Sequence, residues 1–258
     1  MKTLLEKNMK HRAIILAAGR GSRMGEATAS KPKCLNLLAG KELLRWQLES
    51  LSKANIENVT VVRGYRSNML EGSFETIDNT RWNETNMVAS LFCVSSGEYD
   101  QSTIISYSDI AYASDHVKRL NMSQHDITIT ADLNWEYLWK LRFENPLDDA
   151  ETFKSKDSKL MEIGGKTTDI KDIEAQYMGL LKLTPKGWET MYKLYQSFSD
   201  EKKDKMDMTT MLNELLKNKE SIHVVFVEGK WCEADNYSDI VAYEKELEKN
   251  NNWIHDWR

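Results

Sequence analysis

The chain is poor in cysteine, in proline and in long apolar runs, and each shortage excludes a class of protein. Its 258 residues include only three cysteines, which form no CxxC pair and no zinc-ligand spacing: Cys34, Cys93 and Cys232. We therefore expect reduced thiols in a cytoplasmic protein and no disulfide framework. No apolar stretch reaches the roughly 18 residues that a membrane span needs, so we expect no membrane partner.

Basic residues are also in deficit, because 35 Lys and Arg face 40 Asp and Glu, for a formal net charge of -5. A protein that binds nucleic acid usually carries a basic surface, so we expect no nucleic-acid partner. Local groups of cations are then better interpreted as sites for small anions. With 41% hydrophobic residues and only three prolines, the composition is typical of a globular chain without a marked linker.

Short apolar runs alternate with segments of helical periodicity along the chain. The run RAIILAAG (12–19) is continuously apolar, as is typical of a strand buried on both faces of a parallel sheet. Further strand candidates are residues 58–64, 102–109, 126–132, 176–183 and 223–231, and helix candidates are residues 42–55, 87–94, 117–122, 135–142, 187–198, 208–217 and 238–249. The alternation predicts a three-layer α/β domain with a mostly parallel sheet, and a ligand beyond the carboxyl ends of its strands. The charged segment 199–207 is expected to be a solvated loop, with a mobile lid as the alternative.

A glycine-rich loop with four cations, Arg20, Arg23, Lys31 and Lys33, follows the first predicted strand. It departs from the dinucleotide-binding GxGxxG pattern, because its third glycine is out of place and Pro32 prevents an immediate helix, and it lacks the GK[ST] of a P-loop. Glycines let backbone N–H groups approach phosphate oxygens, and clustered cations balance a multiply charged ligand. The loop therefore predicts a nucleoside triphosphate site, the alternative being a surface loop with incidental charges.

The stretches LAAGRGSRM and SKPKCLNLLAGKELL together resemble the signature of nucleotidyltransferases that make sugar nucleotides and CMP- or CDP-linked small molecules. RWNETNMVASLF and ISYSDIAY are similar to the cytidylyltransferases that act on phosphocholine, aminoethylphosphonate and phosphorylated amino compounds. DLNWEYLWKLRFENPLDDAETFK, IEAQYMGLLKL and GKWCEADNYSDI resemble the cytidylyltransferases of phosphoramidate capsule pathways, which act on a phosphorylated glutamine. The resemblance covers about residues 13–240 and implies a Rossmann-like nucleotidyltransferase fold with a mostly parallel mixed central sheet.

The resemblance also implies roles for individual residues. It gives Lys33 and Arg23 a catalytic role at the phosphates, and we expect Lys33 to be an exposed loop lysine that matters more to the chemical step than to folding. The residues expected to bind the nucleotide are Leu16, Ala17, Ala18, Gly19, Gly21, Ser22, Arg23, Lys33, Asn86, Ser90 and Ser108.

Asn86 and Ser90 lie one helical turn apart, so both can hydrogen-bond a pyrimidine edge. The structural alternative is that Asn86 or Thr85 caps the helix. We expect Met87 to belong to the core.

Two aspartates follow predicted strands, Asp109 in SYSDI and Asp235 in WCEAD. Carboxylates at such positions can reach the ligand crevice, and a pair of them suits a hard Mg2+ ion that also binds phosphate oxygens. The resemblance supports both as metal ligands. For each the alternative is a helix N-cap.

The middle of the chain combines aromatic and charged residues. An aromatic wall with acids would suit an ammonium group, and an arginine would suit a carboxylate or phosphate. The candidates for binding the acceptor are Trp135, Trp139, Arg142, Glu151, Glu174 and Gln176. Trp135 and Trp139 share a helical face, which is more often packing.

We therefore expect a Mg2+-dependent cytidylyltransferase. Its partners would be CTP and a small phosphorylated or phosphonate acceptor with an amino group, such as phosphoglutamine, phosphocholine or 2-aminoethylphosphonate. The alternatives are a hexose-1-phosphate nucleotidyltransferase and a regulatory domain that binds nucleotide without turnover. We expect one domain over residues 1–258, with a nucleotide-binding half (12–134), an acceptor-binding half (135–240) and a C-terminal helix and tail (241–258), and a homodimer is left open.

Overall fold

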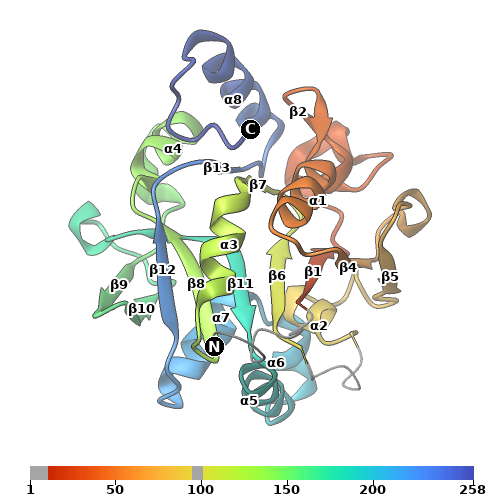
Figure 1. The fold of residues 1–258 in the computed structure, drawn as a ribbon, viewed down its shortest axis with the longest axis vertical. Coiled ribbons are helices and arrows are strands. Elements are labelled where there is room, and N and C mark those ends of the chain that lie inside the picture. The colour runs from red at the N-terminus through yellow and green to blue at the C-terminus, as the bar shows by residue number, and fades with distance from the viewer. Residues whose placement is uncertain (1–10, 95–100) are drawn as a thin grey trace, which may run out of the picture.

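A nine-stranded sheet forms the centre of the computed structural model, which describes residues 11–94 and 101–258 (Figure 1). Its strands are β1 Arg12–Ala17, β4 Asn58–Arg63, β5 Glu75–Asp78, β6 Thr103–Tyr107, β8 Ile127–Asp132, β9 Phe153–Lys156, β10 Lys159–Ile163, β11 Gln176–Leu183 and β12 His223–Val227. Their order across the sheet is β5-β4-β1-β6-β11-β8-β12-β10-β9. The strands β5, β4, β1 and β6 are parallel neighbours, as are β8 and β12, while β11 runs antiparallel between β6 and β8. The predicted mixed, mostly parallel α/β sheet is confirmed.

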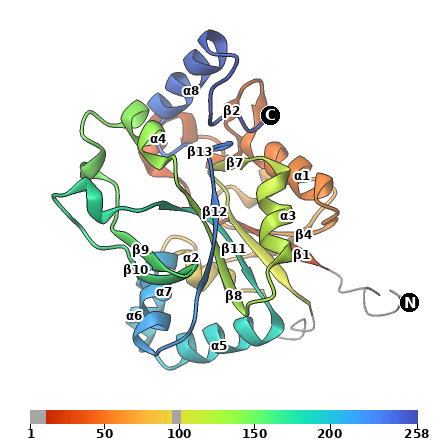
Figure 2. The same cartoon turned by 60° about the vertical axis from the view of Figure 1, so that its left-hand side comes forward.

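Helices cover both faces of this sheet (Figure 2). One face carries α1 Leu43–Lys53 and α3 Ser114–Met122, and the other carries α2 Met87–Leu91, α5 Pro185–Gln196 and α7 Met208–Lys217. Two further helices, α4 Trp135–Arg142 and α8 Tyr237–Lys249, pack against each other beyond one end of the strands (Figure 1). Within the described residues, no helix combines the length and the apolar character needed to cross a bilayer.

The strand β1 shows why its sequence is apolar throughout. Ala13, Ile15 and Ala17 belong to the buried cluster on the α1 face, whereas Ile14 and Leu16 belong to the cluster on the α2 face. Successive side chains of a strand point to opposite faces, so a strand with helices on both sides needs apolar residues at every position.

Two segments differ from the sequence prediction. The segment 199–207 is largely exposed, as expected, but it is not a loop, because Asp200–Lys205 forms helix α6, with Ser199 Oγ accepting a hydrogen bond from the backbone N–H of Lys202. The predicted strand 223–231 is also interrupted. After β12 the chain turns at Gly229 and Lys230, whose φ angles are 65° and 53°.

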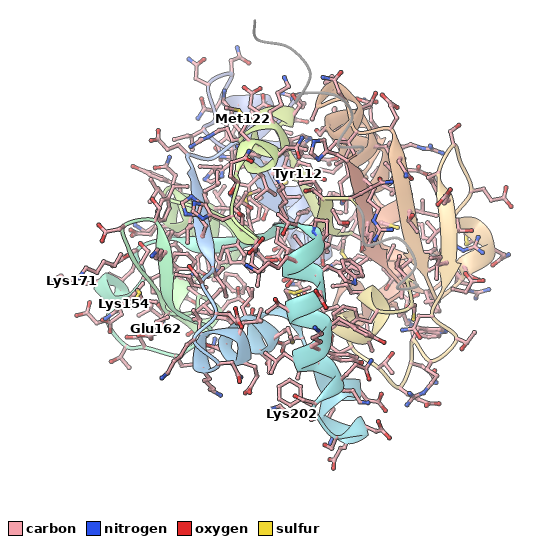
Figure 3. All side chains as sticks on the ribbon, turned by 60° about the horizontal axis from the view of Figure 1, so that its bottom comes forward. Tyr112, Met122, Lys154, Glu162, Lys171 and Lys202 are labelled. Atoms are coloured by element: carbon pink, nitrogen blue, oxygen red, sulfur yellow. The ribbon has the colours of Figure 1, made fainter. Side chains whose placement is uncertain are left out.

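The segment after this turn is the short strand β13 Trp231–Glu233, which pairs antiparallel with β7 Ile110–Tyr112. A second small ribbon joins β2 Leu37–Leu38 to β3 Lys41–Glu42. The β9–β10 hairpin at the sheet edge was not predicted. Its edge is charged, and Lys154, Glu162 and Lys171 project from this side of the molecule (Figure 3).

The close approach of α5 to the start of β8 generates a stability prediction. A Cβ atom on Gly187 would lie 1.9 Å from the carbonyl oxygen of Asp126. Gly187→Ala should therefore lower the free energy of unfolding by about 2 kcal/mol through overpacking, although alanine normally stabilises a helix by about 1 kcal/mol relative to glycine.

Thermal unfolding of Gly187→Ala and of the exposed control Glu189→Ala measures the difference. A melting temperature of Gly187→Ala at or above that of the wild type would contradict the close packing of α5 on β8.

Candidate active site

The glycine-rich loop lies directly after β1 and folds into two 3-10 turns, Ser22–Thr28 and Lys33–Leu35. Gly21 has a left-handed backbone, and a Cβ atom there would lie 2.8 Å from Cβ and Cδ of Lys33. Gly25 has φ 58° and ψ -129°, a region that is essentially confined to glycine. Both glycines are thus required by the turn itself, and Gly21 leaves room for the Lys33 side chain to pass beneath the loop.

Lys33 is buried, so the expectation of an exposed loop lysine is wrong. Only 7% of its side chain is exposed, and its Nζ donates to Asp109 Oδ2 at 2.6 Å and to Asp235 Oδ1 at 2.8 Å. Burial lowers the pKa of Lys33, but the two carboxylates outweigh this and raise it overall. Lys33 therefore remains charged and links the two predicted metal ligands.

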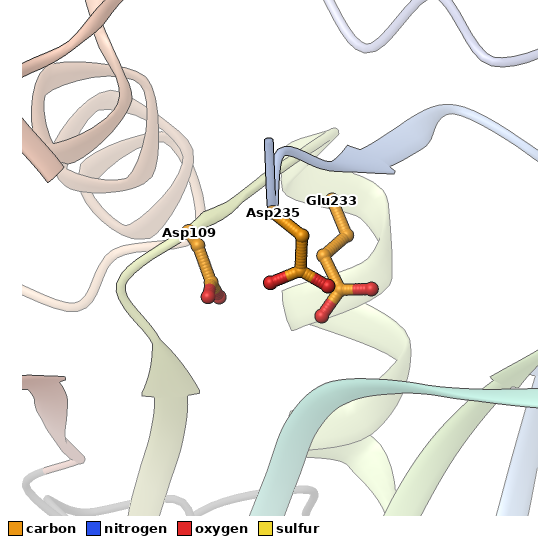
Figure 4. A group of neighbouring side chains, drawn as sticks. All are labelled: Asp109, Glu233 and Asp235. Carbon is orange, nitrogen blue, oxygen red and sulfur yellow. The ribbon is translucent and has the colours of Figure 1, made fainter. Parts of the chain in front are cut away.

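The β7–β13 ribbon brings the two aspartates together. Asp109 immediately precedes β7, Asp235 follows β13, and the backbone N–H of Ala234 donates to the Asp109 carbonyl at 2.9 Å. Glu233, which the sequence reasoning missed, completes a group of three carboxylates with oxygen atoms within 4.8 Å of one another (Figure 4). The i, i+2 spacing of Glu233 and Asp235 in an extended segment was the available signal, since it puts both side chains on one face.

Arg142 braces this carboxylate group from behind. Its side chain has no exposed surface, and it contacts Glu233 at 3.0 Å and Asp235 at 2.9 Å. Arg142 therefore has no exposed side-chain surface for the predicted contact with an acceptor, and its charge pairs with the carboxylates instead. On the outer side, Arg23, with a 65% exposed side chain, reaches the same Asp235 carboxylate at 2.9 Å.

Side chains of helix α8 hydrogen-bond the backbone of the segment that carries Glu233 and Asp235. The carboxylate of Asp239, in the first turn of α8, accepts the backbone N–H groups of Asp235 and Asn236, each at 2.8 Å. The hydroxyl of Tyr243 donates to the carbonyl of Glu233 at 2.7 Å. Burial, followed by the charge of Asp235, raises the pKa of Glu233.

A cavity of about 320 Å³ opens beside the glycine-rich loop and reaches Lys33 and Asp109. All the predicted nucleotide-binding residues except Ala17 line it: Leu16, Ala18, Gly19, Gly21, Ser22, Arg23, Lys33, Asn86, Ser90 and Ser108. Ala17 is buried on the other face of β1, because neighbouring positions of a strand alternate. Met87 packs against the core, as expected, and also lines the cavity. Trp82 and Thr85, which the sequence analysis did not assign to the nucleotide, line it too.

Asn86 also performs the structural alternative. Its Oδ1 accepts the N–H of Met87 at 2.7 Å and so caps α2, and its Nδ2 donates to the carbonyl of Lys205 at 3.3 Å. The backbone N–H of Asn86 donates to the carbonyl of Asp204 at 2.7 Å. The end of α6 thus fixes the start of α2 at the cavity wall.

A second cavity, of about 160 Å³, lies on the other side of the carboxylates and is lined by Glu233 and Asp235. Three predicted acceptor residues line it as well: Trp139, Glu151 and Gln176. Its other lining residues are aromatic, acidic, hydroxyl-bearing and aliphatic: Tyr107, Phe153, Tyr177, Asp149, Thr152, Thr209 and Ile163. Burial raises the pKa of Glu151.

The remaining acceptor candidates lie elsewhere. Trp135 is buried and packs edge-on against Trp139, with ring centroids 5.8 Å apart. Glu174 is exposed and accepts hydrogen bonds from the backbone and hydroxyl of Ser155. Neither residue lines this cavity, so the structure does not bring Trp135 and Glu174 together with the other three candidates.

Known proteins show which family this chain belongs to. Residues 13–136 match the model of the MobA-like NTP transferase domain. The chain is 34% identical to the CTP:phosphoglutamine cytidylyltransferase of Campylobacter jejuni subsp. jejuni, over 92% of this chain and 99% of that protein.

Two solved structures share the fold. The inositol-1-phosphate CTP transferase from T. maritima has a TM-score of 0.72 at 19% identity, over 93% of this chain and 97% of its own. The CTP:phosphocholine cytidylyltransferase from Streptococcus pneumoniae has a TM-score of 0.68 at 20% identity, over 92% of this chain and 99% of its own.

The burial of Lys33 changes what its removal should do. Lys33→Met leaves Asp109 and Asp235 without their shared counter-charge, and breaking a buried ion pair costs about 3–5 kcal/mol. We therefore expect a melting temperature roughly 10 °C lower. The half-exposed Lys31 provides the matched control, Lys31→Met, which should melt within a few degrees of the wild type. Equal melting of Lys33→Met and the wild type would show that the ion pair does not stabilise the fold.

Proposed function

Because this chain belongs to the cytidylyltransferase branch of the nucleotidyltransferase family, we propose that it transfers CMP from CTP to a small phosphorylated or phosphonate acceptor that bears an amino group. The observation that carries the proposal is the place of the three carboxylates between two cavities. Lys33 and Asp109 line the cavity beside the glycine-rich loop, and Asp235 and Glu233 line the other. A nucleotide in the first and an acceptor in the second would meet at this point.

The reaction needs no covalent enzyme intermediate. An anionic phosphate or phosphonate oxygen of the acceptor attacks the α-phosphorus of CTP, a new P–O bond forms, and the bond to the β-phosphate oxygen breaks so that pyrophosphate leaves with its electron pair. The protein's part is to position two anions and to stabilise the charge that develops. Lys33 and Arg23, the two cations beside Asp235 that line the nucleotide cavity, are assigned to the phosphates.

The carboxylate group fits a divalent ion. Oxygen ligands suit Mg2+, and Asp109 Oδ1 is buried with no hydrogen-bond partner in the part of the chain that the structure describes. Asp109 and Asp235 would hold the ion, with Glu233 beside them. Bound there, Mg2+ would neutralise charge on the triphosphate.

The second cavity favours an acceptor with an ammonium group. Asp149 and Glu151 supply negative charge, and Tyr107, Trp139 and Tyr177 supply aromatic surface, which together suit a cation. Neutral hydrogen-bonding groups line this cavity as well, namely Thr152, Gln176 and Thr209, so it is the two acids that distinguish it from a site for an uncharged sugar. The 34% identity to a phosphoglutamine enzyme supports the same choice, and we assign residues 12–134 to the nucleotide and residues 135–240 to the acceptor.

The metal assignment predicts the effect of removing one carboxylate charge. Asp109→Asn and Asp235→Asn should each lower kcat by about 100-fold or more. Each variant would hold Mg2+ less well, so the negative charge that develops on the transferring phosphate would lose its counter-ion. Each should also weaken Mg2+ binding measured by calorimetry in the presence of CTP. Asp115→Asn, on the exposed start of α3, is the control. Wild-type Mg2+ affinity in either variant would remove that residue from the ligand set.

The function itself is tested by pyrophosphate release. The protein is incubated with Mg2+, each of CTP, UTP, ATP and GTP, and each of phosphoglutamine, phosphocholine, 2-aminoethylphosphonate and glucose 1-phosphate. We expect turnover with CTP and an amino-bearing acceptor. Turnover with glucose 1-phosphate alone would favour a sugar nucleotidyltransferase, and nucleotide binding without any turnover would favour a regulatory domain.

A variant in the second cavity makes the acceptor assignment sharper. Glu151→Gln should raise KM for the amino-bearing acceptor by about tenfold, since a charge-assisted hydrogen bond contributes about 1.5–3 kcal/mol, while KM for CTP stays unchanged. The exposed Glu162 of β10 gives the control Glu162→Gln. If KM for the acceptor does not change in Glu151→Gln, the ammonium group binds elsewhere.

A further inference from the structure

Asn79, a buried residue that neither the sequence analysis nor the proposed function uses, lies behind the wall of the nucleotide cavity. It follows β5 directly and is 4% exposed. Its backbone N–H donates to the carbonyl of Arg63 at 2.7 Å, which fixes it to the sheet. Its side chain contacts two hydroxyl groups, those of Thr85 and Ser90, and both residues line the cavity.

The orientation of the Asn79 amide is determined by its neighbours. The backbone N–H of Arg81 can only donate, and it lies 2.9 Å from Oδ1 of Asn79, so this atom must be the oxygen. The Nδ2 group is then the atom that faces the hydroxyls, at 2.9 Å from Thr85 Oγ1 and 3.0 Å from Ser90 Oγ. Each of its two protons serves one hydroxyl, so both hydroxyls act as acceptors toward Asn79.

The hydroxyls of Thr85 and Ser90 differ in whether their own proton is still available for a ligand. Thr85 donates its own proton to the carbonyl of Arg81 at 2.9 Å, so it has no proton left for a ligand. For the proton of Ser90, the described residues offer no hydrogen-bonded acceptor. Asn86 uses its Oδ1 in the cap of α2 and one of its two Nδ2 protons at Lys205, so it retains one proton. Of the two hydroxyls that Asn79 contacts, Ser90 is therefore the one with a proton to donate into the cavity.

We propose that Asn79 is a specificity-determining positioning residue, which makes Ser90 a hydrogen-bond donor and thereby selects a pyrimidine that has an acceptor at ring position 3. Cytosine carries a bare N3 that accepts the Ser90 proton, whereas uracil carries N3–H. To accept from it, Ser90 would have to turn its second lone pair to the base and leave its own proton without an acceptor. A buried donor left without an acceptor costs about 1–3 kcal/mol. The inference rests on the proposed use of CTP, but it concerns the choice of base and not the transfer step.

An isosteric change reverses the polarity. In Asn79→Asp the carboxylate still accepts the Arg81 N–H, but it now accepts from Ser90 as well, so the Ser90 lone pairs face the cavity and match N3–H of uracil. We expect the ratio of the UTP and CTP dissociation constants, measured by calorimetry at pH 8, to fall by about tenfold or more. Repulsion between the new charge and the triphosphate affects both nucleotides equally and cancels in the ratio.

Asn83→Asp is the matched control, because it makes the same change at an exposed position of the same loop, and the ratio should stay at the wild-type value. The effect must also pass through Ser90. In a Ser90→Ala background, Asn79→Asp should leave the ratio unchanged. An unchanged ratio in folded Asn79→Asp, or a fall that persists without the Ser90 hydroxyl, would overturn the proposal.

A measurement on the wild-type protein covers the case in which Asn79→Asp does not fold. 3-Deaza-CTP has a C–H group in place of N3 and should bind to the wild type about tenfold more weakly than CTP does. In Ser90→Ala, 3-deaza-CTP and CTP should bind with equal affinity. Equal binding of CTP and 3-deaza-CTP by the wild type would overturn the proposal. Since these experiments measure binding, a protein that selects CTP but releases no pyrophosphate would refute the proposed function and leave this inference standing.

Discussion

The buried ammonium of Lys33, shared between the carboxylates of Asp109 and Asp235, holds together three segments that are far apart in the sequence. They are the loop after β1, the turn after β6 and the turn after β13. A buried charge is tolerated only when it is paired, and here the pairing extends to Arg142, which supports Asp235 from the opposite side. The proposed reaction centre is therefore built from the same ion pairs that connect these segments of the fold, so stability and chemistry should be coupled there.

The features that could be predicted from the sequence are those with a local signal. The continuous apolar run of β1 reflects burial on both faces, and the glycines and cations after it mark a loop for anions. Asp109 was found because it stands at the end of a strand. Arg142 could not be assigned correctly from local pattern, because its partners Glu233 and Asp235 lie 91 and 93 residues away. Only the tertiary structure distinguishes an arginine that could bind a ligand from one that forms ion pairs with the carboxylates of the site.

The predictions for residues 199–207 and 223–231 were wrong for different reasons. For α6, a run of charged residues was interpreted as a loop, yet Ser199 is a good N-cap and acids precede lysines as the helix dipole favours. The signal for helix α6 was thus present in the sequence. The break between β12 and β13 has a weaker local signal, because it depends on a distant contact. A Cβ atom on Gly229 would lie 2.3 Å from the carbonyl oxygen of Ile254, in the C-terminal segment. Glu228, Gly229 and Lys230 interrupt the apolar run, but nothing in this local pattern indicates that the C-terminal segment packs against the turn.

The first turn of α8 has a consequence for the motions of the site. The amide protons of Asp235 and Asn236 are protected by the Asp239 side chain and not by a strand partner. Their hydrogen exchange with solvent must then follow local opening of the start of α8, while the amides of β1 and β6 exchange only when the sheet opens. The segment that carries Asp235 can thus loosen on its own, and its exchange rate is a direct measure of how rigidly the protein holds that carboxylate before any ligand arrives.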